Sequence, residues 1–274
     1  MRNYIKKTAL LFVLAAPLIF ALHFTGCDSF FTSSFASARD YDARHINVTV
    51  NNLDRWLDRT VGNLELARQV NVAIINRLSD SSLSPQDRAK FQRAGVQIAV
   101  ESSNLGVILL SNALGAITDM ADGLSGDQLE ERLREILGGI QGEFNASGGS
   151  DAAKSISAIV SGDIVNDNGV PTFPPGSFAH DTSPSEAAKA IIVLALAEMG
   201  AGGIDAESFN DFDELAAIGL SLNESGDRIA VDAGASDTAH VLAAYINLIA
   251  SDTSGNFEDN FLTNAIRDAF FGTT

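Results

Sequence analysis

The chain has 274 residues, of which 46% are hydrophobic, enough apolar material for one large domain or two small ones. It carries 18 basic and 35 acidic residues. This excess of acid disfavours nucleic-acid partners, whose phosphates require lysine and arginine, and it disfavours a body lying flat on anionic lipid. The single cysteine, Cys27, excludes a structural disulfide within one chain.

Residues 1–26 have the pattern of a secretory signal peptide. Three basic residues precede an apolar run over residues 9–22, and a small residue, Gly26, stands directly before Cys27. A basic start, an apolar middle and a small residue at the cleavage site are typical of such signals. Pro17 interrupts the apolar run, which is short for a bilayer span of about 20 residues. A cleaved signal is therefore favoured over a retained transmembrane anchor.

The segment Phe24-Thr25-Gly26-Cys27 resembles the lipobox of bacterial lipoproteins, in the relaxed form found in spirochaetes. That family commonly has leucine three residues before the cysteine, where Phe24 stands here. The resemblance implies that the thiol of Cys27 receives a diacylglyceryl group, that the chain is cut before Cys27, and that the new N-terminus is acylated. It also implies a protein of the cell envelope, anchored to the lipid bilayer through Cys27 and facing the periplasm or the cell exterior.

The leader contains three of the 18 basic residues and none of the 35 acidic ones, which leaves a formal charge of −20 from Cys27 onward. Residues 27–45 are rich in serine and lack helical periodicity, so they are predicted to form a flexible tether with a reach of about 25 Å. Phe30, Phe31 and Phe35 lie in this tether. They either contact lipid near the acyl chains or pack on the body, and the sequence leaves both interpretations open.

Residues 46–274 are predicted to form a single all-α domain, a bundle of eight to ten helices, with the loop 161–182 as a candidate point of subdivision. The remainder of the chain resembles uncharacterised helical lipoproteins in this arrangement. Apolar residues at spacings of three and four predict helices over 51–61, over 63–78 and from 85 onward. Asn63 and Ser84 are the predicted N-caps of the second and third helices.

The third helix is predicted to lie at the centre of the bundle, together with a helix near 186–199. Its apolar stripe extends from Phe91 to Met120 with a bend near Gly106, and Glu101 is the only charged residue between positions 94 and 117. A helix that is apolar nearly all round is buried or spans a membrane, and its serine and asparagine residues favour the bundle. Glu101 is a candidate ligand- or ion-binding carboxylate if it is buried. The favoured interpretation is an acid at the surface edge, or one capped by neighbouring serine and asparagine side chains.

Further helices are predicted over about 125–140, 151–165, 184–199, 236–251 and 256–271, two of them opened by capping boxes at Ser125 and Ser183. Residues 161–182 are predicted to be irregular, although they contain the turn signal Asn-Asp-Asn-Gly. His180 lies in this loop and is a second candidate ligand-binding residue, while a plain connection is the favoured interpretation. Residues 220–222 and 228–231 flank a predicted turn and indicate one small β-hairpin.

The sequence contains no motif of a known catalytic or metal site, such as G-x-S-x-G, H-E-x-x-H or zinc-spaced cysteine and histidine. We therefore predict a non-enzymatic interaction or scaffold module with no cofactor, no metal and an envelope protein as partner. The alternative is a ligand-binding or accessory lipoprotein of a transporter, with a pocket between buried helices near Glu101. A hydrolase would require His180 or His240 beside an acid and a serine.

Overall fold

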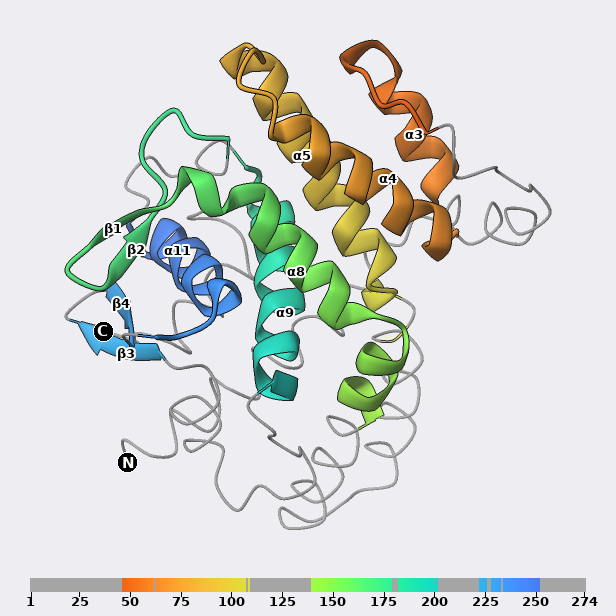
Figure 1. Cartoon of the computed structure of the whole chain (residues 1–274). Helices are drawn as coiled ribbons and strands as arrows, with labels where there is room; N and C mark the ends of the chain where they lie inside the picture. The colour runs from red at the N-terminus through yellow and green to blue at the C-terminus, as the bar shows by residue number, and fades with distance from the viewer. Residues whose placement is uncertain are drawn as a thin grey trace.

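The computed structural model of the chain describes residues 46–61, 63–106, 108, 139–178, 182–201, 222–225, 228–232 and 234–251. These residues are mostly helical, with two small antiparallel hairpins at one end (Figure 1), which confirms the predicted all-α class with a small β-hairpin. Seven helices lie within the described residues, fewer than the eight to ten expected for the whole chain. The predicted signal peptide, the tether, the capping box at Ser125 and the last predicted helix lie outside them.

The N-terminal part of the bundle consists of the 3-10 turn η3 (Val50–Asn52) and helices α3 (Leu53–Thr60), α4 (Leu64–Leu78) and α5 (Pro85–Ser102). Both predicted caps are present. The Asn63 side chain accepts a hydrogen bond from the Leu66 N–H at 3.0 Å, and the Ser84 hydroxyl accepts one from the Asp87 N–H at 3.1 Å. Each satisfies a helix N–H that has no partner within its own helix.

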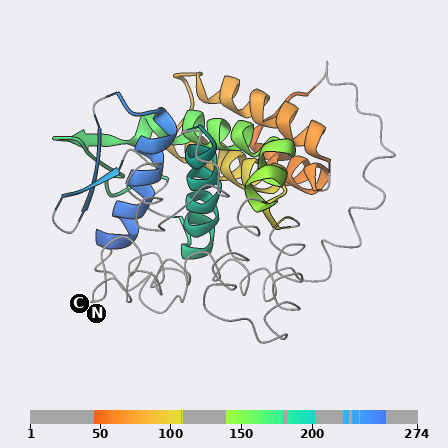
Figure 2. The same cartoon turned by 90° about the horizontal axis from the view of Figure 1, so that it is seen from below.

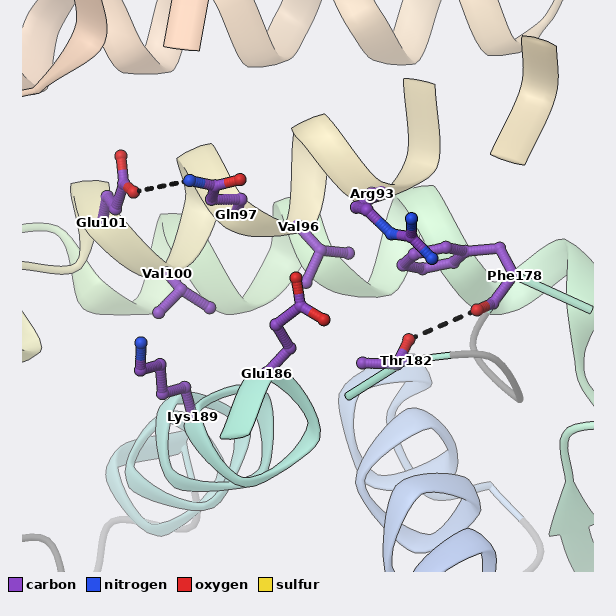
Figure 3. A pocket seen from close by; sticks show the side chains of 9 residues that line it. All are labelled: Arg93, Val96, Gln97, Val100, Glu101, Phe178, Thr182, Glu186 and Lys189. Carbon is purple, nitrogen blue, oxygen red and sulfur yellow. Dashed lines mark hydrogen bonds between the residues drawn. The ribbon is translucent and has the colours of Figure 1, made fainter. Parts of the chain in front are cut away.

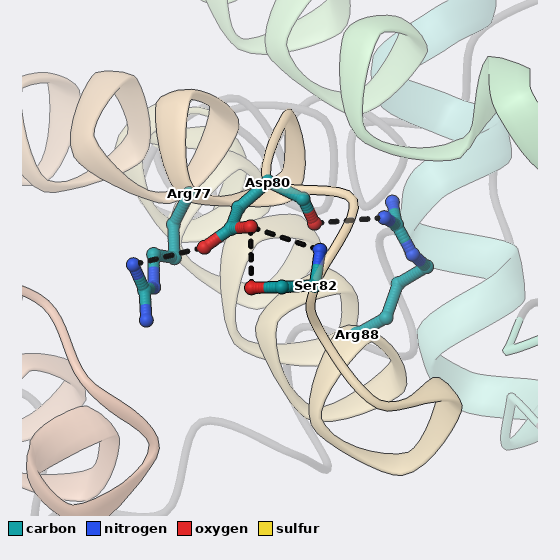
Figure 4. A network of polar contacts seen from close by, with 4 residues as sticks. All are labelled: Arg77, Asp80, Ser82 and Arg88. Atoms are coloured by element: carbon teal, nitrogen blue, oxygen red, sulfur yellow. Dashed lines mark hydrogen bonds and ion pairs between the residues drawn. The ribbon is translucent and has the colours of Figure 1, made fainter.

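A polar network closes the turn between α4 and α5 (Figure 4). Asp80 accepts hydrogen bonds from the hydroxyl and the N–H of Ser82, at 2.6 and 2.9 Å, and forms an ion pair with Arg77 at 3.2 Å. The Ser82 hydrogen bonds hold the pKa of Asp80 below its usual value, and Arg77 acts in the same direction. Arg88 donates to the carbonyls of Leu78 and Asp80 and thereby satisfies acceptors at the end of α4.

Helix α5 ends earlier than the apolar stripe predicts. The helix ends at Ser102, Asn104 leaves helical geometry with a φ of 56°, and residues 105, 106 and 108 are helical again. Asparagine enters this left-handed region more readily than most residues. The Ser103 hydroxyl also bonds to the Val100 carbonyl at 2.6 Å. The predicted bend near Gly106 is therefore a break two residues earlier, and residues 109–138 lie outside the described part.

Helix α8 (Gly149–Val160) lies at the centre of the bundle beside α5: α8 packs against α4, α5, α9 and α11, and α5 packs against α3, α4, α8 and α9 (Figures 1 and 2). Helix α8 is shorter than the predicted span of 151–165, because a 3-10 turn, η4 (Ser161–Asp163), follows Val160 directly. The Gln92 side chain of α5 donates to the Ile159 carbonyl and to Asp163, both at 3.1 Å. This amide thus joins α5 to the end of α8.

Helices α9 (Pro184–Ala201) and α11 (Asp237–Ser251) form the other side of the core. The predicted capping box opens α9, since the Glu186 carboxylate accepts from the N–H and the hydroxyl of Ser183 at 3.0 and 2.7 Å. At the opposite end of α9, the Glu198 carboxylate accepts from the hydroxyl of Ser236, which also caps α11 through the Ala239 N–H. Every residue of α11 between positions 241 and 249 is buried.

The loop 161–182 is not irregular throughout, and on this point the prediction is wrong. It contains a hairpin of β1 (Val165–Asp167) and β2 (Val170–Thr172), closed by Asn168 and Gly169 at φ 52° and 84°. Two consecutive positive φ values are the mark of a tight hairpin turn for which Asn-Gly is the preferred sequence. The predicted second hairpin is present as β3 (Leu222–Ser225) and β4 (Arg228–Val231).

The two hairpins are joined to each other and to α11. The Val231 N–H donates to the Gly169 carbonyl at 2.8 Å. The fully buried side chain of Asn247 accepts from the Ile229 N–H at 2.7 Å and donates to the carbonyls of Ile229 and Pro171 at 2.8 and 2.9 Å. One helical amide therefore satisfies backbone groups of both β2 and β4.

Candidate functional site

A pocket of about 180 Å³ lies between α5, the start of α9 and the residues on either side of positions 179–181 (Figure 3). Its apolar wall consists of Val96 and Val100 on α5 and of Phe178. The Thr182 hydroxyl, at the same end as Phe178, donates to the Phe178 carbonyl at 3.3 Å. The pocket is partly open rather than enclosed.

Both helices contribute charges of each sign to the pocket. Helix α5 provides Arg93 and Glu101, which are two helical repeats apart and therefore lie on one face. Helix α9 provides Glu186 and Lys189, which are one turn apart and both extend toward α5 (Figure 3). The pocket thus has two cationic and two anionic side chains around an apolar wall.

Glu101 lines this pocket but is exposed, not buried. The Gln97 amide donates to its carboxylate at 3.1 Å, so the neighbour that bonds it is glutamine, not serine or asparagine. Desolvation by nearby protein atoms raises the pKa of Glu101, and the Gln97 hydrogen bond and the charge of Lys189 oppose that rise. The structure therefore places Glu101 at the edge of a pocket, and its ligand-binding role stays a prediction.

His180, the second candidate, lies outside the described residues, although Phe178 and Thr182 on either side of that gap both line the pocket. Arg93, Glu186 and Lys189 were not identified as site residues from the sequence. Each is an ordinary charged residue at a helical surface position, and nothing local indicates that α5 and α9 bring them together.

His240 does not form the arrangement that a hydrolase would require. Its Nδ1 contacts the backbone carbonyl of Ser236 at 2.9 Å, one helical turn earlier. The Ser236 hydroxyl instead donates to Glu198 and accepts from the Ala239 N–H. A serine, a histidine and an acid are therefore close together, but the histidine does not contact the hydroxyl, and the serine serves as a helix cap.

Tyr245 of α11 is fully buried, and its ring packs edge-to-face against the ring of Phe173 at a centroid distance of 4.9 Å. Among the described residues, its hydroxyl has no hydrogen-bond partner. Burial raises the pKa of Tyr245 strongly, and the nearby carboxylates of Glu186 and Asp163 raise it further. Burial likewise raises the pKa of Asp163, against the hydrogen bond from Gln92.

We expect Tyr245→Phe to raise the free energy of unfolding by about 1 kcal/mol, because a buried polar group without a partner is destabilising. Urea denaturation monitored by circular dichroism measures the change. Thr60→Val is the matched control, because the buried Thr60 hydroxyl does have a partner, the Leu57 carbonyl at 2.8 Å. The control should lose stability, and a comparable loss in Tyr245→Phe would contradict the prediction.

The described residues contain no group of three or more histidine, cysteine or acidic side chains placed to hold a metal ion. Within the same residues, no helix combines the length and the apolar character that a bilayer span requires. Comparisons of the chain with protein-family models, with curated proteins and with solved structures gave no match.

Proposed function

We propose that the chain is a lipid-anchored lipoprotein of a bacterial cell envelope, and that its helical body is a non-enzymatic interaction or scaffold module. The observation that carries this proposal is the position of the single cysteine. Cys27 directly follows the small residue Gly26 at the end of a basic and then apolar leader. A diacylated cysteine at this position gives stable membrane attachment, since each buried CH₂ contributes about 0.8 kcal/mol.

The charge of the body supports attachment through a tether rather than through the body's own surface. The residues from Cys27 onward carry a formal charge of −20, and anionic lipid headgroups repel such a surface. A serine-rich segment of 19 residues (27–45) separates the cysteine from the first described element. The body then stands in the aqueous phase of the envelope, where it is accessible to protein partners.

The use of buried polar side chains supports a structural rather than a catalytic role. Gln92 bonds α5 to α8, Glu198 bonds α9 to the start of α11, and Asn247 bonds α11 to both hairpins. Each of these groups is engaged in holding one element to another. The pocket, at about 180 Å³, is also smaller than the roughly 300–1,000 Å³ of sites for drug-sized ligands, which weighs against a transporter-accessory role with a large ligand.

Mass spectrometry of the protein extracted from bacterial membranes tests the anchor. We expect a mature chain that begins at a diacylated Cys27, and we expect Cys27→Ser to remain uncleaved and without lipid. Ser34→Ala, a small change in the same segment, should be processed normally. An intact Met1 in the unaltered protein, or cleavage at another residue, would contradict the proposal.

Crosslinking in the intact envelope tests whether the helical body is an interaction or scaffold module. A scaffold module should give reproducible crosslinks to a defined envelope protein, and these should be lost when Cys27→Ser prevents anchoring. Crosslinks that are unchanged in the unanchored variant would argue against a role at the membrane.

A further inference from the structure

In the pocket between α5 and α9, the guanidinium of Arg93 and one carboxylate oxygen of Glu186 have no partner among the described residues. Arg93 extends from α5 beside the Phe178 ring, and Glu186 points from α9 toward α5 (Figure 3). Within the described part of the chain, no hydrogen bond or ion pair engages the Arg93 guanidinium. The Oε2 atom of Glu186 accepts both bonds from Ser183, whereas Oε1 has no partner among the described residues.

The carboxylate at the other end of the pocket, Glu101, already has a hydrogen-bond partner. Lys189 lowers the pKa of Glu101 through its positive charge, and Gln97 donates to the same carboxylate at 3.1 Å. An incoming ligand would have to displace these interactions at the Glu101 end. At the Arg93 end it would displace no hydrogen bond or ion pair made by the described residues.

The size and the wall of the pocket restrict what fits between these charges. Its volume of about 180 Å³ lies below the roughly 300–1,000 Å³ of pockets for drug-sized ligands. Val96, Val100 and Phe178 form an apolar surface next to Arg93 and Glu186. The pocket therefore suits one small molecule with both charged ends and an apolar part.

We propose that this pocket binds a small zwitterion of amino-acid size with a short apolar side chain. Its carboxylate contacts the Arg93 guanidinium, whose planar set of donors matches a carboxylate, and its ammonium group contacts Oε1 of Glu186. Hydrogen bonds between ionised groups are about twice as strong as those between neutral ones. This ligand site is not part of the proposed scaffold role, and binding at it does not depend on the lipid anchor.

Isothermal titration calorimetry of the full chain in detergent, with L-leucine as probe, tests the proposal. L-leucinamide lacks the carboxylate, and 4-methylpentanoate lacks the ammonium group. We expect saturable leucine binding, and binding of either analogue that is weaker by about tenfold or more, in keeping with the loss of one charged hydrogen bond. Glycerophosphoethanolamine carries one negative and one positive charge, as leucine does, in the phosphodiester form of a lipid headgroup. If it binds more tightly than leucine, the assignment to an amino acid is wrong.

Two variants test which pocket residue contacts the carboxylate of leucine and which contacts its ammonium group. Arg93→Ala should weaken leucine binding by about tenfold or more and leave leucinamide binding unchanged. Glu186→Gln should weaken leucine binding and leave 4-methylpentanoate binding unchanged, and its capping box is retained because glutamine also suits that position. Thermal melting checks that both variants are folded.

Arg55→Ala and Glu65→Gln, which alter exposed residues on α3 and α4, are the matched controls and should bind leucine normally. Absence of saturable binding by leucine, or leucine binding that neither pocket variant weakens, would overturn the proposal. Either result would leave the lipid anchor untouched, because that anchor is tested by the mass of the mature chain.

Discussion

Replacing Asn247 by leucine is expected to lower the free energy of unfolding by at least about 3 kcal/mol. The substitution leaves three backbone groups without the partner that Asn247 supplies, namely the N–H and the carbonyl of Ile229 and the carbonyl of Pro171. Each buried polar group that loses its hydrogen bond costs about 1–3 kcal/mol. The apolar surface that leucine adds recovers only part of this loss.

Denaturation in guanidinium chloride measures the effect, provided that the slope of the transition stays constant between variants. Asn76→Leu on the exposed side of α4 is the control, because it makes the same change where water solvates the side chain. Such a surface change normally stays within about 0.5 kcal/mol. If Asn247→Leu were as mild as the control, Asn247 would not be the link between the hairpins and α11.

The second large effect is expected at Gly149, where alanine should lower the free energy of unfolding by about 1–3 kcal/mol, the usual range for overpacking a core. Gly149 is buried in the first turn of α8, and a Cβ atom there would overlap with the ring of Phe144. Phe144 is itself fully buried, so its ring cannot move aside without displacing other core residues.

Gly142→Ala is the matched control, because Gly142 lies in the helix over 139–146 with nothing within 4 Å of an added Cβ. That substitution should stabilise the protein by about 0.4–1 kcal/mol through a less flexible unfolded chain. The double variant Gly149→Ala/Phe144→Leu should lose less free energy of unfolding than the two single variants lose in sum, because neighbouring sites are coupled. Strict additivity would show that Gly149 is sensitive for a reason other than the Phe144 ring.

Helix starts could be predicted from the sequence because their chemistry is local. Asn63, Ser84 and Ser183 each cap the helix that follows within a few residues, and the structure has each helix beginning where the cap indicates. The hairpin at 165–172 was missed because its strands are only three residues long and one contains a proline. The turn signal was present, but strands this short give no alternating pattern.

Position within the bundle could not be predicted, because an apolar composition indicates burial and not the identity of the neighbours. The stretch after residue 94 is more apolar than α8, yet α5 and α8 each pack against several other helices. For the same reason, most of the charged residues of the pocket could not be predicted from the sequence. Glu101 could be selected as the lone charge in an apolar stretch, whereas Arg93, Glu186 and Lys189 meet only because tertiary packing brings α9 beside α5.

The hydrogen bonds between α11 and the two hairpins determine how the hairpins unfold locally. Two-stranded hairpins are marginally stable on their own in water. Here the Asn247 amide and the bond between Gly169 and Val231 join both hairpins to a helix that is buried along most of its length. The Ile229 amide can therefore exchange with solvent only when its bond to Asn247 of α11 breaks, so we expect its protection to follow that of the helix.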